Sequence, residues 1–365
     1  MTPRVAFLSL KPAEDAREIR SAVDRVIDRG WFVLGPEVEA FEHEFAAASG
    51  APYAVGVGSG TDAIALTLRA LDVGPGDEVI TTPLSAAFTA LAIAMVGARP
   101  VFADIDPVRL TIDPAQIERM IGPRTRAIVP VHLYGQPADM SGIERVASRH
   151  SLAVVEDCCQ AHLATVQGRP VGTIGAAGAF SFYPTKNLGA LGDGGAVITR
   201  DAALADRVRQ LRNGGQRARY DHDRLGVNSR LDEIQAAVLR VRLLRLQAWT
   251  ARRRELAARY RVALGALPVE VPPECDAGHV YHLFVIRVPD RNRFQEQLAA
   301  DGIETLVHYP LPIPRQRAFT HMSPADCPIA ARACDEVLSL PLHPGLSEDD
   351  LDSVVLAAKG HGCAR

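Results

Sequence analysis

"VGVGSGTDAIAL", residues 55–66, is the stretch of sequence that decides the fold. Its apolar beginning is typical of a buried strand, and its glycine-rich middle indicates a tight turn. The remaining residues have the spacing of a helix that begins at about Thr61. A strand that turns directly into a helix is the building unit of an α/β protein, so a chain of that class should repeat it.

The same alternation continues to about residue 200. Short apolar runs are separated by segments whose apolar residues follow the helical period. This pattern predicts an α/β fold, a mostly parallel sheet flanked by helices, with ligands at the carboxyl ends of the strands. The expected strands are 53–57, 77–82, 99–105, 126–134, 152–158 and 194–199, and the expected helices between them include 61–71, 86–96 and 138–150.

The C-terminal third follows a different pattern. A long helical pattern runs from about Leu231 to Leu264, and a segment rich in proline and glycine follows it at 265–278. Residues 279–288 then predict a strand and residues 292–303 a helix. We place a domain boundary within the long helix, with a large cofactor-binding domain at 1–245 and a smaller C-terminal α+β domain at 246–365.

The composition excludes several classes of protein. Apolar residues make up 47% of the 365 residues, enough for a sizeable core, and the net charge of −3 does not favour nucleic acid or an anionic membrane. No apolar run approaches the ~18 residues of a membrane span, and charge begins too early for a signal peptide. We expect a cytoplasmic protein that binds neither nucleic acid nor a membrane.

The cysteines and histidines do not indicate a metal site. The six cysteines contain no CxxC pair, and the adjacent Cys158 and Cys159 read as reduced thiols of a cytoplasmic protein. His132, His162 and His343 have no ligand spacing between them. We therefore predict no bound metal.

The glycine-rich turn before Thr61 has two interpretations. Backbone N–H groups at a helix start bind phosphate, and the hydroxyls of Ser59 and Thr61 would add donors. A dinucleotide fingerprint would need glycine in place of Thr61, which disfavours an NAD-dependent oxidoreductase. Taken alone, the turn fits a plain strand–helix connection somewhat better than a phosphate site.

Asp157 and Lys186 are the residues that suggest chemistry. Asp157 ends an apolar strand, where its carboxylate could protonate a pyridine nitrogen, or could instead cap a helix or form a structural ion pair. Lys186 lies in "SFYPTKNLGALGDGG" (181–195), after a small, apolar segment that suggests burial. A lysine, an aspartate and a phosphate cradle are together the needs of pyridoxal 5′-phosphate, whose aldehyde forms a Schiff base with lysine.

Nearly the whole chain resembles the DegT/DnrJ/EryC1/StrS family, the sugar-aminotransferase branch of the fold-type I pyridoxal phosphate enzymes. The motifs occur in order and at the spacing of the family, which makes chance agreement implausible. They are "GWFVLGPEVEAFEHEFA" (30–46), "VGVGSGTDAI" (55–64), "GARPVFADID" (97–106), "VHLYGQPADM" (131–140), "EDCCQAH" (156–162), "SFYPTKNLGALGDGGAVIT" (181–199), "GVNSRLDEIQAA" (226–237) and "LSLPLHPGLSEDDLDSV" (338–354).

The resemblance implies a role for individual residues. Lys186 would form the Schiff base, Asp157 would pair with the ring nitrogen, and Gln160 would approach the ring hydroxyl. Asn228 would reach the phosphate from a neighbouring subunit, which implies a homodimer with shared active sites. The resemblance further implies phosphate contacts from Gly60, Thr61 and Ser181, beside the Ser59 hydroxyl, and substrate contacts from Tyr183, His308 and Tyr309.

Two positions depart from the family pattern. Ala86 stands where the family usually has an aromatic residue that stacks on the cofactor. Phe88, two positions on, is the candidate replacement, with core packing as an equal alternative. Pro314 stands where many members have histidine, which puts other substrate contacts of that loop in doubt.

The function implied by the resemblance is transamination of a nucleotide-linked keto sugar, with glutamate as the amino donor. Asp193 in "GDGG" resembles members that aminate a 3-keto hexose, although it could merely cap the loop. The alternatives are a 4-keto sugar or cyclitol aminotransferase and a non-catalytic regulator that binds pyridoxal phosphate. A sugar 3-dehydratase of the family has histidine in place of the lysine, so Lys186 argues against it.

Overall fold

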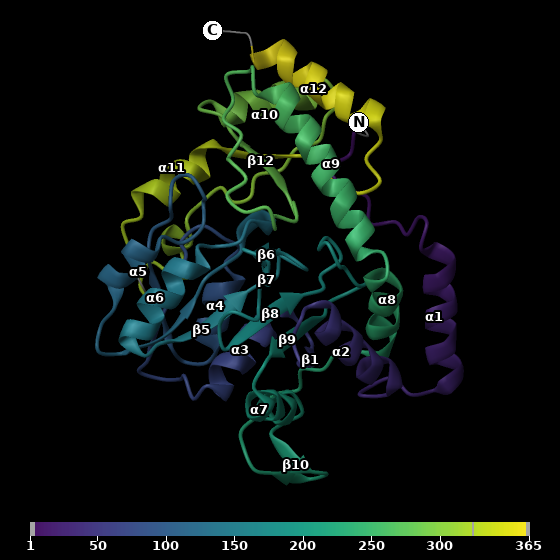
Figure 1. Cartoon of the computed structure of the whole chain (residues 1–365), viewed down its shortest axis with the longest axis vertical. Helices are drawn as coiled ribbons and strands as arrows, with labels where there is room; N and C mark the ends of the chain where they lie inside the picture. Colours follow the sequence, from purple (N-terminus) through teal and green to yellow (C-terminus); the bar gives the residue numbers. More distant parts are fainter. Residues whose placement is uncertain (1–3, 323–324, 363–365) are drawn as a thin grey trace.

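A seven-stranded sheet forms the centre of the protein, in the order β1-β9-β8-β5-β4-β2-β3 (Figure 1). The structure is a computed structural model that describes residues 4–322 and 325–362. Only β9 is antiparallel to its neighbours among these strands, so the predicted α/β fold is confirmed. The strands are β1 (Tyr53–Val57), β2 (Glu78–Thr81), β3 (Arg99–Phe102), β4 (Thr125–Val129), β5 (Ala153–Asp157), β8 (Ala177–Ser181) and β9 (Gly195–Thr199).

Helices cover both faces of the sheet. The first face packs on α3 (Gly60–Ala70), α4 (Phe88–Met95) and α7 (Ala202–Arg212). The second face packs on α2 (Pro36–Ala48), α5 (Pro114–Met120), α6 (Met140–His150) and α8 (Glu233–Leu243). Outside α8 lies α1 (Ala16–Arg29), whose Ala22 and Val26 pack on Ala237. The sheet is therefore buried on both sides, as its mostly parallel strands require.

The sequence did not predict β8, although this strand lies inside the sheet between β9 and β5. Its sequence, AGAFS, consists mostly of small residues, which are poor strand formers. The structure explains why they are small. Gly178 packs directly against Gly172, so a Cβ atom at Gly178 would clash with that backbone.

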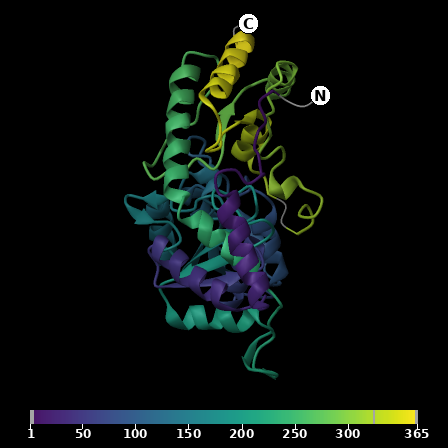
Figure 2. The same ribbon diagram turned by 90° about the vertical axis from the view of Figure 1, so that its right-hand side faces the viewer.

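The C-terminal part lies beyond one end of the sheet and has its own core (Figures 1 and 2). That core contains Tyr260, Phe284 and Leu298, and the N-terminal segment joins it through a bridge from Val5 to Ile303. We keep the division near residue 245 as a proposal that this separate core supports. The elements are α9 (Leu246–Leu264), β12 (Phe284–Arg287), α10 (Arg291–Ala300), the 3₁₀ turn η2 (Ile313–Arg315), α11 (Pro328–Glu336), β13 (Val337–Leu340) and α12 (Glu348–Gly362).

The pattern that predicted one long helix corresponds to two, α8 and α9. The chain turns at Leu244 and Arg245, where the Arg245 N–H donates to the carbonyl of Arg242. The apolar period continues through this turn because Leu246 packs in the core of the sheet, while Tyr260 packs in the C-terminal core. Periodicity alone therefore could not reveal the break.

Small elements complete the fold. The 3₁₀ turn η1 (Leu133–Gly135) follows β4, and β6 (Thr165–Val166) pairs with β7 (Arg169–Pro170). A hairpin of β10 (Gln216–Ala218) and β11 (Asp221–His222) projects beyond α7 at the far end from the C-terminal part (Figure 1).

No helix within residues 4–322 and 325–362 is long and apolar enough to cross a membrane. The described cysteines are free thiols, and Cys363 lies outside the described residues. The free thiols are Cys158, Cys159, Cys275, Cys327 and Cys334.

Candidate active site

Lys186 lies in the loop that leaves β8, at the edge of the sheet where the strands end. Its backbone N–H donates to the carbonyl of Tyr183 at 2.8 Å, and its side chain is half-buried. The loop turns tightly, since a Cβ atom at Gly189 would lie 2.5 Å from the carbonyl oxygen of Pro184. Burial lowers the pKa of the Lys186 amine, and Cys159 and Asp157 oppose this shift. The neutral, nucleophilic form of the amine is thereby favoured.

Asp157 ends β5 and is 5% exposed. Its Oδ2 accepts a hydrogen bond from the hydroxyl of Thr89 at 2.6 Å, and its Oδ1 accepts one from the N–H of Cys159 at 3.0 Å. It forms no ion pair in the described part of the chain and does not begin a helix, so neither structural alternative from the sequence describes it. A carboxylate has about four acceptor positions, so Asp157 keeps capacity for a further donor.

Gln160 and Tyr309 form a second polar group beside Asp157. The Gln160 Oε1 accepts from the N–H of Tyr134 at 2.7 Å, and its Nε2 donates to the Tyr309 hydroxyl at 3.0 Å. Burial raises the pKa of Tyr309 to about 12. Burial, with a smaller contribution from Lys186, lowers the pKa of His308 to about 4. Both side chains are therefore neutral hydrogen-bonding groups at neutral pH.

The start of α3 meets the ends of β5 and β8. Ser59 caps the helix by accepting from the N–H of Asp62 at 3.1 Å. A Cβ atom at Gly60 would lie 2.7 Å from both Cys159 Sγ and Ser181 Cβ, so glycine is required for this close approach. The first N–H groups of a helix lack intrahelical partners and attract anions. The phosphate of a cofactor fits here, close to Thr61 and Ser181.

Three predicted site residues are exposed. Phe88 is 62% exposed at the first turn of α4, so it is not part of the core, and its stacking on a cofactor stays a prediction. Tyr183 is 50% exposed in the lysine loop. Asn228 is exposed, and its backbone forms a bridge with Asn213.

Two contributors to the site were missed in the sequence, Thr89 and Tyr134. Thr89 is buried and fixes the Asp157 carboxylate. Tyr134 positions Gln160 through its N–H and donates its own hydroxyl to the carbonyl of His308. A threonine in the first turn of the helix after β2 was the available signal for Thr89. Tyr134 gave none, because its N–H and its hydroxyl meet Gln160 and His308 only in the folded chain.

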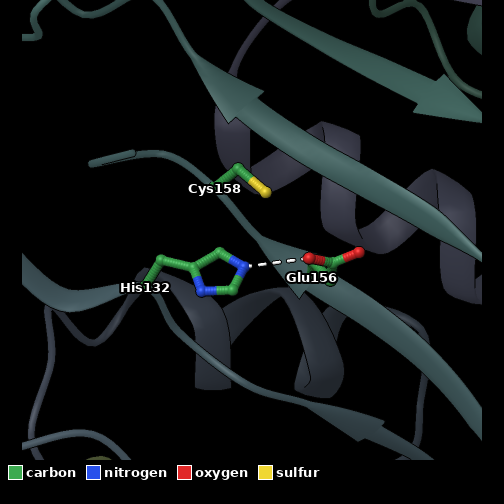
Figure 3. Close-up of side chains that lie close together, drawn as sticks. All are labelled: His132, Glu156 and Cys158. Carbon is green, nitrogen blue, oxygen red and sulfur yellow. Dashed lines mark hydrogen bonds and ion pairs between the residues drawn. The ribbon is translucent and has the colours of Figure 1, made fainter. Parts of the chain in front are cut away.

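His132, Glu156 and Cys158 are the one group in the described residues with ligand atoms close enough for a metal (Figure 3). The N–H of Ala138 donates to His132 Nδ1 at 3.0 Å, so the proton is on Nε2, which donates to Glu156 at 3.0 Å. Backbone N–H groups at residues 172, 174 and 175 donate to the same carboxylate at 2.8 Å each. These hydrogen bonds use the ligand atoms of the histidine and the carboxylate, so the group is a structural brace.

Comparison with known proteins gives a consistent result. A model of the DegT/DnrJ/EryC1/StrS aminotransferase family matches residues 13–359. A dTDP-3-amino-3,4,6-trideoxy-alpha-D-glucose transaminase from Streptomyces venezuelae is 48% identical over 364 residues, covering 98% of this chain and 96% of the relative.

Solved structures agree with this similarity. The crystal structure of DesV from S. venezuelae in complex with a ketimine intermediate has a TM-score of 0.97 and 47% identity, and each chain is covered completely. The structure of ntda from Bacillus subtilis with bound cofactor PMP has a TM-score of 0.93 and 32% identity, covering 99% of this chain and 85% of that one.

Proposed function

Because the chain belongs to the DegT/DnrJ/EryC1/StrS aminotransferase family, we propose that it aminates a keto sugar carried on a nucleotide diphosphate, for amino-sugar biosynthesis. Glutamate is the proposed amino donor. The chain is a pyridoxal phosphate-dependent aminotransferase, as the sequence predicted. The observation that carries the proposal is the placement of the Lys186 amine and the Asp157 carboxylate at one edge of the sheet, beside the start of α3.

The residues at this edge fit the cofactor group by group. When bound, pyridoxal 5′-phosphate supplies an aldehyde that takes up the amino group and a ring that accepts negative charge. Asp157, held by Thr89, would keep the ring nitrogen protonated. The start of α3 and Ser181 would hold the phosphate. The neutral Lys186 amine would anchor the cofactor and would carry a proton to and from the reacting carbon.

Neutral groups suit the substrate side of the site. Tyr309 keeps its phenol proton at neutral pH because burial raises its pKa to about 12. His308 is uncharged because burial lowers its pKa to about 4. Both rings can therefore form hydrogen bonds with sugar hydroxyl groups without attracting the negative diphosphate. Tyr183, exposed beside Lys186, is the third proposed substrate contact.

The proposed reacting carbon is C3 of a nucleotide-linked 3-keto hexose. The relative from S. venezuelae is named for a 3-amino sugar, which supports this choice. Asp193 is exposed and accepts no hydrogen bond from described side chains or backbone, so capping of its loop does not explain it. The test is incubation with glutamate and matched 3-keto and 4-keto nucleotide sugars. NMR analysis should locate the new amine at C3. Exclusive amination at C4 would overturn the choice of carbon but not the proposed transamination.

A turnover assay also separates the remaining alternatives. Amination of a cyclitol ketone with no turnover of any nucleotide sugar would identify a cyclitol aminotransferase. Tight cofactor binding without turnover of either substrate class would instead identify a regulator. In the proposed function, glutamate should convert the bound cofactor to its aminated form, and a nucleotide keto sugar should return it.

A homodimer is proposed from the exposed site residues. Phe88 precedes Thr89 and Tyr183 lies in the lysine loop, yet both are largely exposed in one chain, and Asn228 is exposed as well. If Asn228 reaches the phosphate in a second subunit, mixing inactive Lys186→Ala and inactive Asn228→Ala subunits should restore part of the activity. Mixed dimers without activity would place Asn228 in the structure of its own subunit.

The cytoplasm is the proposed compartment. Five described cysteines are free thiols, and the adjacent Cys158 and Cys159 remain unpaired. Reduced thiols in a protein of this size are typical of the cytoplasm.

A further inference from the structure

A cavity of ≈ 270 Å³ lies beside the lysine loop, between the N-terminal segment and the C-terminal core. Phe7 and Leu8 form an apolar wall, and Thr185, the residue before Lys186, forms the wall on the side of the loop. A space of this size is near the lower end of small-molecule sites, so it suits a small metabolite and not a nucleotide sugar. The cavity shares His308 with the proposed sugar contacts, and its volume suits the smaller of the two substrates.

Arg253 of α9 forms the charged part of this cavity and is only 5% exposed. Its Nη1 donates to the carbonyl oxygens of Leu342, Tyr281 and His282 at 2.8, 3.2 and 3.4 Å. Its Nε has no partner, and no carboxylate in the described ranges forms an ion pair with it. Burial lowers the pKa of Arg253 to about 10, so the guanidinium remains charged at neutral pH.

Arg252, the residue before Arg253 on α9, shows that the lack of an ion pair at Arg253 is unusual. Arg252 forms ion pairs with Glu255 at 2.8 Å and Glu348 at 2.6 Å and is partly exposed. A buried charge without a counter-ion is costly, and a guanidinium matches the geometry of a carboxylate. Arg253 therefore has the chemistry of a binding site for an anion, and no described side chain supplies that anion.

The other ionisable groups of the cavity leave this positive charge dominant at its buried end. His282 Nδ1 donates to Asn187 Oδ1 at 3.2 Å, and burial places the pKa of His282 well below the usual value. His308 is neutral for the same reason. Glu304 is exposed, and its carboxylate accepts from the N–H of Phe7 at 2.8 Å, so its negative charge lies at the solvent side.

We propose that this cavity binds a carboxylate group of the amino-acid donor against Arg253. The proposal rests on the proposed transamination, which needs an amino-acid donor close to Lys186. Because Thr185 lines the cavity, a small amino acid bound there lies beside the loop that holds the amine. Neutral His282 and His308 would offer hydrogen bonds without competing for the negative charge.

Glutarate is the probe for the test, because it has both carboxylates of glutamate but no amine to react. Calorimetric titration of glutarate into the cofactor-loaded enzyme should show saturable binding. Arg253→Gln should weaken this binding by about 10- to 100-fold, the value of one charge-assisted hydrogen bond, and raise the KM for glutamate in parallel. The KM for the nucleotide sugar should stay within about two-fold.

Two further variants show whether a loss of glutarate binding in Arg253→Gln comes from the lost guanidinium or from misfolding. Arg252→Gln changes the neighbouring arginine on the same helix and should leave glutarate binding unchanged. Leu8→Trp narrows the cavity from the opposite wall without touching α9, and should weaken binding as well. Arg253→Gln or Leu8→Trp enzyme that binds glutarate as the unchanged enzyme does, or unchanged enzyme that binds none, would overturn the proposal.

The outcome is distinguishable from a failure of the proposed function. If no keto sugar is aminated but glutarate binds and its binding requires Arg253, the carboxylate site is supported and the proposed sugar acceptor is wrong. If sugars are aminated but Arg253→Gln does not weaken glutarate binding, the transamination is supported and the donor carboxylate binds elsewhere.

Discussion

Glu156 and Asp157 are consecutive residues of β5 and have opposite surroundings. Side chains alternate along a strand, so Glu156 points into the core that α2 and α6 cover, and Asp157 points toward α4 and the site. Glu156 is completely buried and accepts four hydrogen bonds. Asp157 accepts two.

The difference teaches how a structural acid can be told from a functional one. The four donors to Glu156 come from the chain and occupy its acceptor positions, so it can only hold the segment at 172–175 in place. Asp157 is oriented by Thr89 and Cys159 but remains able to bind a ligand donor. Both carboxylates are almost equally buried, so burial does not separate them. Unused hydrogen-bonding capacity is the better indicator of a functional acid.

The largest expected effect is on the functional side of this comparison, at Lys186. Lys186→Ala should abolish turnover because both the covalent anchor for the cofactor and the proton carrier are lost. Borohydride treatment of the loaded enzyme followed by peptide mapping should place the cofactor on Lys186. Lys11→Ala is the control, since Lys11 is exposed in the N-terminal segment, and a label found on any other peptide would contradict the assignment.

The second prediction concerns Asp157. Asp157→Asn should reduce kcat by at least ~100-fold, because the ring nitrogen loses the charge that keeps it protonated. The change keeps size and shape, so thermal unfolding should stay nearly unchanged. Near-normal kcat with tight cofactor binding would show that Asp157 is structural like its neighbour.

Glu156→Gln should produce the reverse pattern. The amide replaces one acceptor oxygen by a donor facing backbone N–H groups, so the free energy of unfolding should fall by about 3–5 kcal/mol. Urea unfolding measures this loss. Folded variant enzyme should keep its kcat within a few-fold, and a stable variant with strongly reduced kcat would break the comparison.

The smallest expected effect is a change in acid stability at His162. This ring is fully buried against Phe180 and Phe182, its nitrogens have no partner among the described residues, and burial lowers its pKa to about 3. The unfolded state therefore takes up the proton first, and folding stability falls as the pH drops from about 6.5 toward 3.

His162→Phe removes this titration. Between pH 6.5 and 5 the variant should lose about 2 kcal/mol less of its free energy of unfolding than the unchanged enzyme. Urea unfolding at several pH values measures the difference. His43→Gln changes an exposed histidine on α2 and should not alter the pH slope, and equal slopes for His162→Phe would contradict the buried neutral ring.

Much of the fold followed from local pattern. The alternation of apolar runs and helical spacing predicted six strands of the sheet and α3, α4 and α6 close to their observed positions. It failed where tertiary contacts override local preference. Small residues in β8 are required by the approach of Gly172, and the helix break at Leu244 lies inside an unbroken apolar period.

For the site, the sequence by itself determined which chemical groups are present: a lysine in a glycine-rich loop, an aspartate at a strand end and a glycine-rich helix start. Those features are local, because they depend on residue type and on distance along the chain. Only the tertiary structure decided that Asp157 remains open to a ligand while Glu156 is saturated, and that Arg253 is buried without a counter-ion among the described residues. Hydrogen-bond saturation depends on donors and acceptors far apart in the chain, such as the donor Thr89 and the acceptor Asp157, and these meet only when the sheet and its helices assemble.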